Sequence, residues 1–401
     1  MITSTYEYEK IRITDYVVMF LILCISGNPL FVYADTKWLF VISAAVLALL
    51  CLKTKVPIYS RQLGVWLCIS CVLFFFQLII LDLVSIPADV NFLCRLWIAF
   101  LSVSFFGLKF RETYLRVMVF VCLVSIPLFL IESITGTMFG IEFDRYKTLL
   151  IYNQIVKHGF FDTSVRNCGM FWEPGAFQGY IMLIPLLFYD KLMYLWTHRK
   201  KEVVVLLTAF ILTLSTTAYI TLFIFIGLTI LTGRKIGIFT KTAIIACICA
   251  VAVFFVWEQD FVGDKIIKQF EEAKEIQEGD ISWDRMGAMV VDLYNIKRHP
   301  LVGNGFIDES RYGAIGEYMH GAGNGLSGSI NIFGIPFILL YFISLFKNYG
   351  CYPVAHRWIF LLVIALLLYG EYFLNYPLFW TLLFIKIPTN NENDSSIINS
   401  I

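Results

Sequence analysis

Residues 300–305 read PLVGNG and residues 320–325 read HGAGNG, and both stretches lie in one long polar insert between about Glu258 and Leu326. Almost everything outside this insert is apolar. Hydrophobic residues make up 59% of the chain and charged residues only 15%, which is typical of integral membrane proteins and unusual for a soluble chain of this length. We therefore expect apolar helices to hold the polar insert at one face of a bilayer.

Apolar runs long enough to cross about 30 Å of hydrocarbon recur along the whole sequence. They predict an all-α bundle of about twelve transmembrane helices, in which residues 1–401 form a single integral membrane domain. The expected spans lie near residues 16–33, 37–52, 63–82, 92–108, 115–132, 176–190, 203–215, 217–232, 241–257, 326–346, 357–370 and 373–387. Tyr and Trp stand near many of their ends, as expected for side chains at the membrane interface.

The distribution of Lys and Arg predicts the orientation of this bundle. If the N-terminus is cytoplasmic, the basic residues gather in the cytoplasmic turns, and the short turns on the opposite side carry almost none. The basic residues of the cytoplasmic turns are then Lys53, Lys55, Arg61, Lys109, Arg111, Arg116, Lys191, Arg199, Lys200, Lys201, Arg234, Lys235, Lys241, Lys347 and Arg357. Both termini are cytoplasmic in this arrangement. Two long segments, 133–175 and 258–326, face outward, so that both are available to one active site.

Cysteine usage and net charge argue against several classes of protein. The ten cysteines lie mostly inside apolar runs, and the pair Cys68 and Cys71 has no His or Cys partner at metal-binding spacing. We interpret them as buried small hydrophobic residues, with no disulfide framework and no metal site. The formal net charge is +1, and no basic patch stands apart from the residues that flank the apolar runs. The sequence therefore predicts no nucleic-acid partner.

The first outward segment ends in RNCGMFWEPGAF at residues 166–177. Pro174 suits the first turn of a helix, where its missing N–H is no loss. Arg166 is a candidate for binding phosphate oxygens, and Trp172 can offer a flat face to a sugar or an isoprenoid. Glu173 is either a base or the ion-pair partner of an arginine. The alternative is that this segment only starts a helix and anchors it with aromatic residues.

Within the long insert, periodicity predicts an amphipathic helix from Asp264 to Ile276 and a second helix from Ser282 to Lys297. Arg285 would project from the first turn of the second helix, where the helix dipole also favours an anion. Arg285 shares a stripe of this helix with Met289, Asp292 and Ile296. The alternative for Arg285 is an ordinary surface ion pair with Asp284 or another carboxylate.

His320 opens the glycine-rich run that leads into the next apolar segment. Gly321, Gly323 and Gly325 remove side-chain bulk around it, so a bulky lipid-linked substrate could approach there. Histidine titrates near neutral pH, which suits a general base, although a lone exposed histidine usually has no such role. Asn324 in the same run is a candidate substrate-binding residue.

Together these motifs resemble the superfamily of O-antigen polymerases (Wzy type) and O-antigen ligases. The residues that carry the resemblance are Arg166, Gly169, Phe171, Glu173 and Pro174, followed by Arg285, Pro300, Gly303, Gly305 and His320. The resemblance covers the topology of the whole chain and specific motifs over about 166–177 and 282–335. The Glu-Pro pair after the first arginine is more similar to the polymerases than to the ligases.

This resemblance implies a metal-independent and cofactor-free glycosyltransferase in a bacterial inner membrane, with its active site on the periplasmic side. Its substrates would be oligosaccharides linked to undecaprenyl diphosphate, and a chain-length regulator is a conceivable partner besides the membrane lipids. A polymerase would move the growing glycan to the non-reducing end of a new lipid-linked repeat unit, whereas a ligase would move the finished glycan to lipid A-core. The resemblance implies catalytic roles for His320 and Arg285, and substrate binding by Arg166, Trp172, Glu173 and Asn324.

Two other classes stay open on the residues alone. Metal-dependent lipid-linked glycosyltransferases usually need paired carboxylates in an early outward loop, but Asp35, Asp82 and Asp89 are scattered. A flippase or transporter of lipid-linked oligosaccharides also commonly has about twelve spans. Such proteins tend to show internal repeats and charges in mid-membrane, and neither is evident here. The long asymmetric outward insert favours an enzyme.

Overall fold

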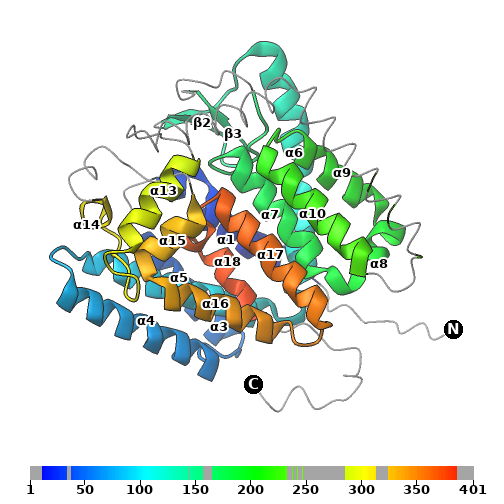
Figure 1. Cartoon of the computed structure of the whole chain (residues 1–401). Coiled ribbons are helices and arrows are strands. Elements are labelled where there is room, and N and C mark those ends of the chain that lie inside the picture. The colour runs from blue at the N-terminus through cyan, green and yellow to red at the C-terminus, as the bar shows by residue number, and fades with distance from the viewer. Residues whose placement is uncertain are drawn as a thin grey trace. The chain divides into compact units, whose positions relative to one another are not determined.

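The chain is mostly helical, with one small antiparallel sheet (Figure 1). A computed structural model of the chain describes residues 11–33, 38–143, 145–156, 165–232, 237, 242, 246, 285–312 and 324–385. Within these ranges the helices follow the apolar runs of the sequence, which agrees with the predicted all-α class except for the small sheet. The expected span at 241–257 and the expected amphipathic helix at 264–276 lie outside the described residues, apart from the isolated positions 242 and 246.

The chain divides into two compact units, and each is described by itself. The first unit comprises Met1–Tyr59, Trp97–Ser215 and Tyr376–Thr381, and the second comprises Ser60–Leu96, Thr216–Asn375 and Leu382–Ile401. Both α5 (Ile86–Phe106) and η5 (Thr381–Leu383) cross a boundary between the units.

The first unit is built from helices of varied length and a three-stranded sheet. Its described elements are α1 (Ile13–Gly27), α2 (Pro29–Val32), α3 (Leu39–Lys53), η1 (Gly107–Lys109), α6 (Phe110–Thr135), β1 (Ile141–Phe143), β2 (Tyr146–Thr148), β3 (Asn153–Ile155), α7 (Pro174–Leu187), η2 (Tyr189–Lys191), α8 (Leu192–His198), α9 (Lys200–Ile211) and α18 (Pro377–Trp380). The strands pair antiparallel in the order β1-β2-β3, with Lys147 opposite both Glu142 and Gln154. This sheet lies in the outward segment predicted at 133–175, and the sequence did not reveal it.

The core of the first unit is aromatic and forms where α1 meets α7. The ring of Phe171 stacks on Tyr180 at 4.4 Å and on Phe177 at 5.5 Å between ring centres. Gly27 makes this possible, because a Cβ atom there would lie 2.3 Å from the Phe171 ring. The backbone N–H of Trp172 donates to the Gly27 carbonyl at 3.0 Å. The end of α1 therefore fixes the segment that leads into α7.

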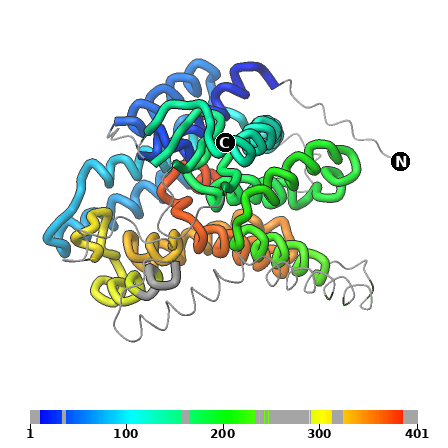
Figure 2. Tube along the Cα trace, turned by 90° about the horizontal axis from the view of Figure 1, so that it is seen from above, coloured from blue at the N-terminus to red at the C-terminus, as the bar shows by residue number. Residues whose placement is uncertain are grey.

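The second unit holds the described part of the polar insert against apolar helices. Its elements are α4 (Arg61–Ile80), α10 (Thr216–Thr232), α13 (Arg285–Ile296), α14 (Asp308–Tyr312), α15 (Gly325–Phe333), α16 (Ile335–Asn348), α17 (Val354–Gly370) and η4 (Phe373–Asn375). Helix α10 lies alongside α17, as Figures 1 and 2 both show. Helix α13 packs against α15. The described helix α13 confirms the predicted second helix of the insert over residues 285–296.

The turn at 300–305 fits into a break between α15 and α16, which meet at an angle of 118°. Gly334 adopts a φ of +81° at this break, and a Cβ atom on Gly303 would lie 2.3 Å from the Ile332 carbonyl oxygen. The buried Gln77 of α4 donates to the carbonyls of Val302 at 2.6 Å and Ile332 at 2.8 Å. The run predicted as one span at 326–346 is therefore two helices, because the turn occupies the space between them.

The last apolar run differs from its prediction. Between residues 373 and 383 the chain forms two short 3₁₀ helices with α18 between them, and α18 begins at Pro377. A proline cannot donate a backbone hydrogen bond to the preceding turn, so Pro377 favours the first turn of a helix. The prediction of one continuous helix at 373–387 is wrong over these residues.

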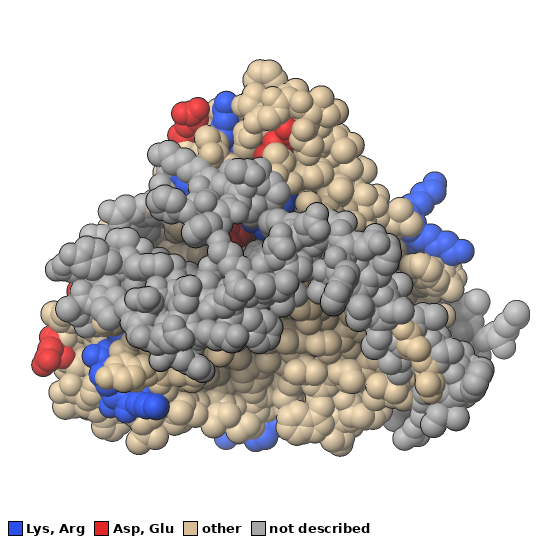
Figure 3. Space-filling view, turned by 45° about the horizontal axis from the view of Figure 1, so that its top comes forward, with Lys and Arg blue, Asp and Glu red and all other residues tan. Residues whose placement is uncertain are grey.

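Two described helical segments are long and apolar enough to cross a membrane, namely α4 and the stretch Ile86–Thr135, and the bent pair α15 and α16 is a third if it counts as one span. Five shorter apolar helices accompany them. Acidic and basic side chains are sparse on the described surface visible in Figure 3. These apolar helices indicate association with a membrane, whereas the expected number of about twelve spans stays a prediction.

Candidate functional site

In the first unit, charged and aromatic side chains meet where the chain enters α7. We call Tyr33, Arg145, Tyr146 and Glu173 the Glu173 cluster. The Nη2 atom of Arg145 lies 3.3 Å from Glu173 Oε1 and 3.2 Å from the Tyr33 hydroxyl, and its Nε donates to the Tyr146 hydroxyl at 2.9 Å. The Arg145 and Glu173 side chains are 40% and 34% exposed. Solvent and a ligand can therefore reach this ion pair.

The two tyrosine rings hold the Arg145 guanidinium in place. They stack on each other at 5.5 Å, and the guanidinium carbon lies 5.6 Å from the Tyr33 ring centre and 5.2 Å from that of Tyr146. A cation over an aromatic face is attracted by the ring quadrupole. The arrangement offers a preorganised cation beside an exposed ring edge, which suits an anionic ligand that carries a sugar.

Local sequence explains why the loops meet here. Asn28 donates through its side-chain amide to the carbonyls of Leu150 at 2.7 Å and Met170 at 3.0 Å. Gly169 adopts a left-handed φ of +53°, and its carbonyl accepts from the Asn153 N–H. Glu173 is the residue before α7, and Pro174 is the first residue of that helix, as the sequence predicted. Glu173 is thereby held at a helix N-terminus, a position that favours a carboxylate.

Arg166 and Glu173, two of the predicted substrate-binding residues, both lie within electrostatic range of the buried thiol of Cys168. Burial raises the pKa of the Cys168 thiol, while the positive charges of Arg166 and Arg145 act to lower it. Glu132 and Glu173 also lie within electrostatic range of this thiol. The first unit thus brings Arg166, Arg145 and Glu173 into one charged region.

Trp172 does not form an exposed surface on which a sugar could stack. Its side chain is buried, and its ring lies 4.9 Å from Tyr376 and 6.4 Å from Tyr180. All of these residues belong to the first unit. In this structure the Trp172 ring is part of the aromatic core behind the Glu173 cluster.

In the second unit, a buried carboxylate organises the polar insert. We call Asp292, Arg311, Tyr312, Ser327 and Asn331 the Asp292 cluster. Asp292 is fully buried and accepts from Ser327 Oγ at 2.6 Å, Asn331 Nδ2 at 2.8 Å and the Tyr312 hydroxyl at 3.2 Å. The Tyr312 hydroxyl accepts in turn from Arg311 Nη2 at 2.6 Å. Helices α13, α14 and α15 are joined through this one carboxylate.

The electrostatics of Asp292 show two opposed effects. Burial raises the pKa of the Asp292 carboxyl above its ordinary value. The hydrogen bonds from Ser327, Asn331 and Tyr312 and the charge of Arg311 act to lower that pKa. The burial effect is the larger. The fold therefore buries a carboxylate at a cost in free energy, and the hydrogen-bond donors around Asp292 offset part of that cost.

The predicted residue Asn324 connects to the same cluster. Its Oδ1 atom caps α15 by accepting from the backbone N–H groups of Leu326 and Ser327, both at 3.1 Å. Asn331 links Asp292 to the turn at 300–305, because its Oδ1 accepts from Asn304 Nδ2 at 2.7 Å. The structure therefore joins the N-terminus of α15 to α13 through Ser327 and to the glycine-rich turn through Asn331.

The other two predicted residues of the insert are only partly placed. Arg285 is the first residue of α13, two helical turns before Asp292, and its side chain lies outside what the structure describes. His320 lies outside the described residues altogether. Within the second unit, the structure thus brings together Asn324 and the helix that Arg285 begins.

Arg145 and Arg311 are the charged residues that sequence reasoning missed. Arg145 lies in the turn between β1 and β2, and no motif marks it, since only the fold of the small sheet carries it to Glu173. Arg311 lies in a short helix of five residues, α14. The predicted stripe of α13 did contain Asp292. The sequence therefore indicated the central carboxylate of the Asp292 cluster but not the residues that contact it.

No protein-family model matches this chain, and a search of curated proteins found no significant match.

Proposed function

We propose that this protein is a polysaccharide polymerase of the O-antigen or capsule type. It would transfer a growing glycan from undecaprenyl diphosphate to the non-reducing end of a lipid-linked repeat unit, without a metal. The motifs around Arg166 and Arg285 support this proposal, as do the apolar helices that indicate membrane association. In this proposal the protein lies in a bacterial inner membrane, with both termini cytoplasmic and the site periplasmic.

The observation that carries the proposal is the charged region at the start of α7. Arg145 is reachable from solvent beside Glu173 and two tyrosines, and Arg166 lies within electrostatic range of the nearby Cys168 thiol, as Arg145 does. Two guanidinium groups in one charged region suit a diphosphate, because guanidinium binds phosphate oxygens through paired N–H donors. Tyrosine rings beside them suit a sugar.

The chemistry of the donor explains why such a site is sufficient. A diphosphate is already a good leaving group, so the reaction needs positive charge on the departing oxygens more than it needs an acid. Each charge-assisted hydrogen bond from Arg166 or Arg285 would contribute on the order of 1.5–3 kcal/mol. Glu173, paired with Arg145, acts in this proposal as a brace for that guanidinium.

His320 is the proposed general base for the attacking sugar hydroxyl. A positioned base accelerates such a step typically by about 10²–10⁴-fold. The step breaks the bond between the anomeric carbon and the diphosphate oxygen and forms the new glycosidic bond, while the hydroxyl proton passes to His320. One direct displacement predicts inversion at the anomeric carbon. A product with the same anomeric configuration as the donor would contradict that prediction.

The test is the glycan profile of a deletion strain complemented with wild type, Arg166→Ala, Arg285→Ala or His320→Ala at matched protein levels. His299→Ala and Lys297→Ala are matched controls, since they remove the same residue type or charge from the same insert. We expect a single repeat unit on its acceptor in the deletion strain and in the three site variants. The two controls should give long chains.

Other outcomes would contradict the proposal in distinct ways. Long lipid-linked polymer that is never attached to lipid A-core would identify a ligase. Loss of repeat units from the outer face of the membrane would identify a flippase or transporter. Normal chains from all three site variants, with a phenotype in the deletion strain, would refute the site and leave the class standing.

A further inference from the structure

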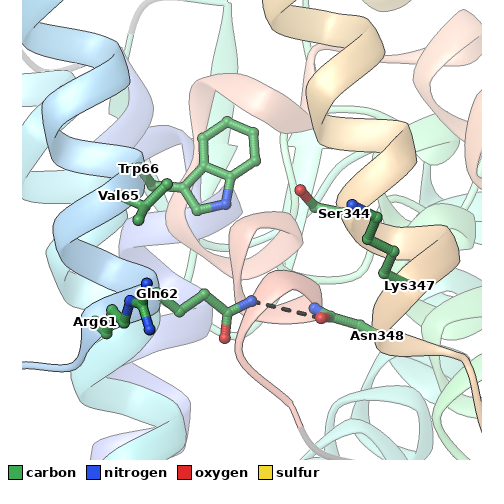
Figure 4. A pocket seen from close by; sticks show the side chains of 7 residues that line it. All are labelled: Arg61, Gln62, Val65, Trp66, Ser344, Lys347 and Asn348. Atoms are coloured by element: carbon green, nitrogen blue, oxygen red, sulfur yellow. Dashed lines mark hydrogen bonds between the residues drawn. The ribbon is translucent and has the colours of Figure 1, made fainter.

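A cavity of about 420 Å³ lies between α4 and α16 in the second unit (Figure 4). It is lined by Arg61, Gln62, Val65 and Trp66 from α4 and by Ser344, Lys347 and Asn348 from α16. This volume lies within the range of about 300–1,000 Å³ that small-molecule sites occupy. It belongs to neither the Glu173 cluster nor the Asp292 cluster.

The charge of this cavity is positive. None of the described residues that line it is acidic, and Arg61 and Lys347 are both exposed. Within the part of the chain that the structure describes, neither side chain makes a hydrogen bond or an ion pair. Arg61 is also the first residue of α4, where the helix dipole adds partial positive charge. The cavity therefore attracts an anion.

The side-chain amides of Gln62 and Asn348, which line the cavity, already make hydrogen bonds within the protein. Gln62 Nε2 donates to the Leu383 carbonyl at 2.6 Å, and Asn348 Nδ2 donates to the same carbonyl. The two amides also reach toward each other across the cavity, with Nε2 of Gln62 3.5 Å from Oδ1 of Asn348 (Figure 4). These two amides hold the end of η5 in place, so Arg61, Lys347 and the Ser344 hydroxyl are the donors left for a ligand.

Apolar surface leads away from the cavity along both helices. Arg61 begins α4 and Lys347 lies in the last turn of α16, so the two helices run antiparallel from the cavity. On α4, Val65 and Val72 are about half exposed, and on α16 Leu340 and Ile343 are 39% and 48% exposed. A cationic cavity at the end of two exposed apolar stripes has the shape of a site for an amphiphile.

We propose that this cavity binds the headgroup of an anionic membrane phospholipid. Its phosphodiester would accept hydrogen bonds from Arg61 and Lys347, with the Ser344 hydroxyl as a further donor, and its acyl chains would lie on the apolar stripes of α4 and α16. The predicted orientation of the chain puts Arg61 and Lys347 in cytoplasmic turns. The cytoplasmic leaflet carries the anionic lipids that such residues attract. This proposal rests on the cavity, the apolar stripes beside it and the predicted orientation, and it does not depend on the proposed polymerase activity.

The test is native mass spectrometry of the full-length protein in detergent, with phosphatidylglycerol or phosphatidylethanolamine of identical acyl chains. We expect preferential retention of phosphatidylglycerol by the wild type. Each basic residue near an anionic lipid contributes about fivefold in affinity. Arg61→Gln should therefore weaken binding about fivefold, and the double variant Arg61→Gln/Lys347→Gln roughly thirtyfold. Equal retention of phosphatidylglycerol by the double variant would overturn the proposal.

Three controls separate this site from general charge effects. Lys53→Gln removes an exposed basic residue at the end of α3 and should leave binding unchanged. Ser344→Trp fills the cavity without changing its charge and should abolish the preference for phosphatidylglycerol. Thermal unfolding without added lipid verifies that each variant is folded. If inorganic phosphate displaces the lipid as effectively as phosphatidylglycerol itself does, the cavity is a site for free phosphate and the lipid proposal fails.

Discussion

The Glu173 cluster and the Asp292 cluster combine similar groups in opposite environments. Each places a carboxylate near an arginine and a tyrosine. Glu173 is about a third exposed and makes one ion pair with Arg145. Asp292 is fully buried and accepts three side-chain hydrogen bonds, with Arg311 acting on it through Tyr312 and through its charge.

This difference separates a site that can bind from one that holds the fold together. An exposed ion pair contributes little to stability, and its groups can exchange a partner for a ligand. A buried carboxylate that already accepts three hydrogen bonds has little capacity left for a ligand, and its removal leaves several donors unsatisfied. We therefore assign ligand recognition to the Glu173 cluster and assembly of the insert to the Asp292 cluster.

The largest effect should come from Asp292→Ala. The substitution leaves three donors without an acceptor and removes one of the two carboxylates near the buried Arg311, which keeps its ion pair with Asp308 at 3.3 Å. We therefore expect the free energy of unfolding to fall by about 3–5 kcal/mol. Chemical unfolding in mixed micelles would measure the change. Asp82→Ala is the matched control, because Asp82 is exposed in the same unit, and it should change the free energy by less than about 0.5 kcal/mol.

A second prediction concerns the turn at 300–305, which positions Asn304 to donate to Asn331 of the Asp292 cluster. Gly303→Ala forces a left-handed residue and places a Cβ atom 2.3 Å from the Ile332 carbonyl oxygen, so we expect a loss of about 2–4 kcal/mol. Gly305→Ala has the same backbone strain, but its Cβ atom would meet only side chains, Leu81 at 3.3 Å and Gln77 at 3.8 Å. It should cost about 1–2 kcal/mol. Equal costs for the two variants would show that the close fit against α15 is unimportant.

The pH dependence of stability should identify the buried carboxylate. Because burial raises the pKa of Asp292, the folded protein binds that proton more tightly than the unfolded chain does. Protonation of Asp292 therefore stabilises the folded state. This stabilisation is fully present below the ordinary carboxyl pKa of about 3.9 and is lost as the pH rises through the raised pKa of Asp292. The stability of wild type relative to Asp292→Asn should therefore fall with rising pH across that window. A relative gain in stability across the same window would contradict the assignment.

The smallest effect on stability should come from substitutions in the exposed ion pair of Arg145 and Glu173. Glu173→Gln and Arg145→Gln should each change the free energy of unfolding by less than about 1 kcal/mol, and a double-mutant cycle should give a coupling of similar size. The same variants should impair binding of a diphosphate-linked sugar, as measured by native mass spectrometry. A coupling as large as the Asp292 effect would remove the distinction between the two clusters.

Much of the fold followed from the sequence alone. The apolar runs predicted most of the described helices, because burial of apolar side chains and lipid exposure both demand continuous helical segments. Pro174 predicted the start of α7, and the stripe containing Asp292 and Ile296 predicted α13. Local preferences decide such features within a few turns of chain, so a single sequence is sufficient to reveal them.

Tertiary structure alone decided which side chains meet. Arg145 reaches Glu173 through a three-stranded sheet that no strong pattern announced, and Arg311 reaches Asp292 through Tyr312 in a five-residue helix. The break at Gly334 depends on the turn at 300–305 filling the space between α15 and α16. These features rest on contacts between residues distant in the chain. Hydrophobic periodicity and capping signals carry no information about them, because they report only on neighbours along one element.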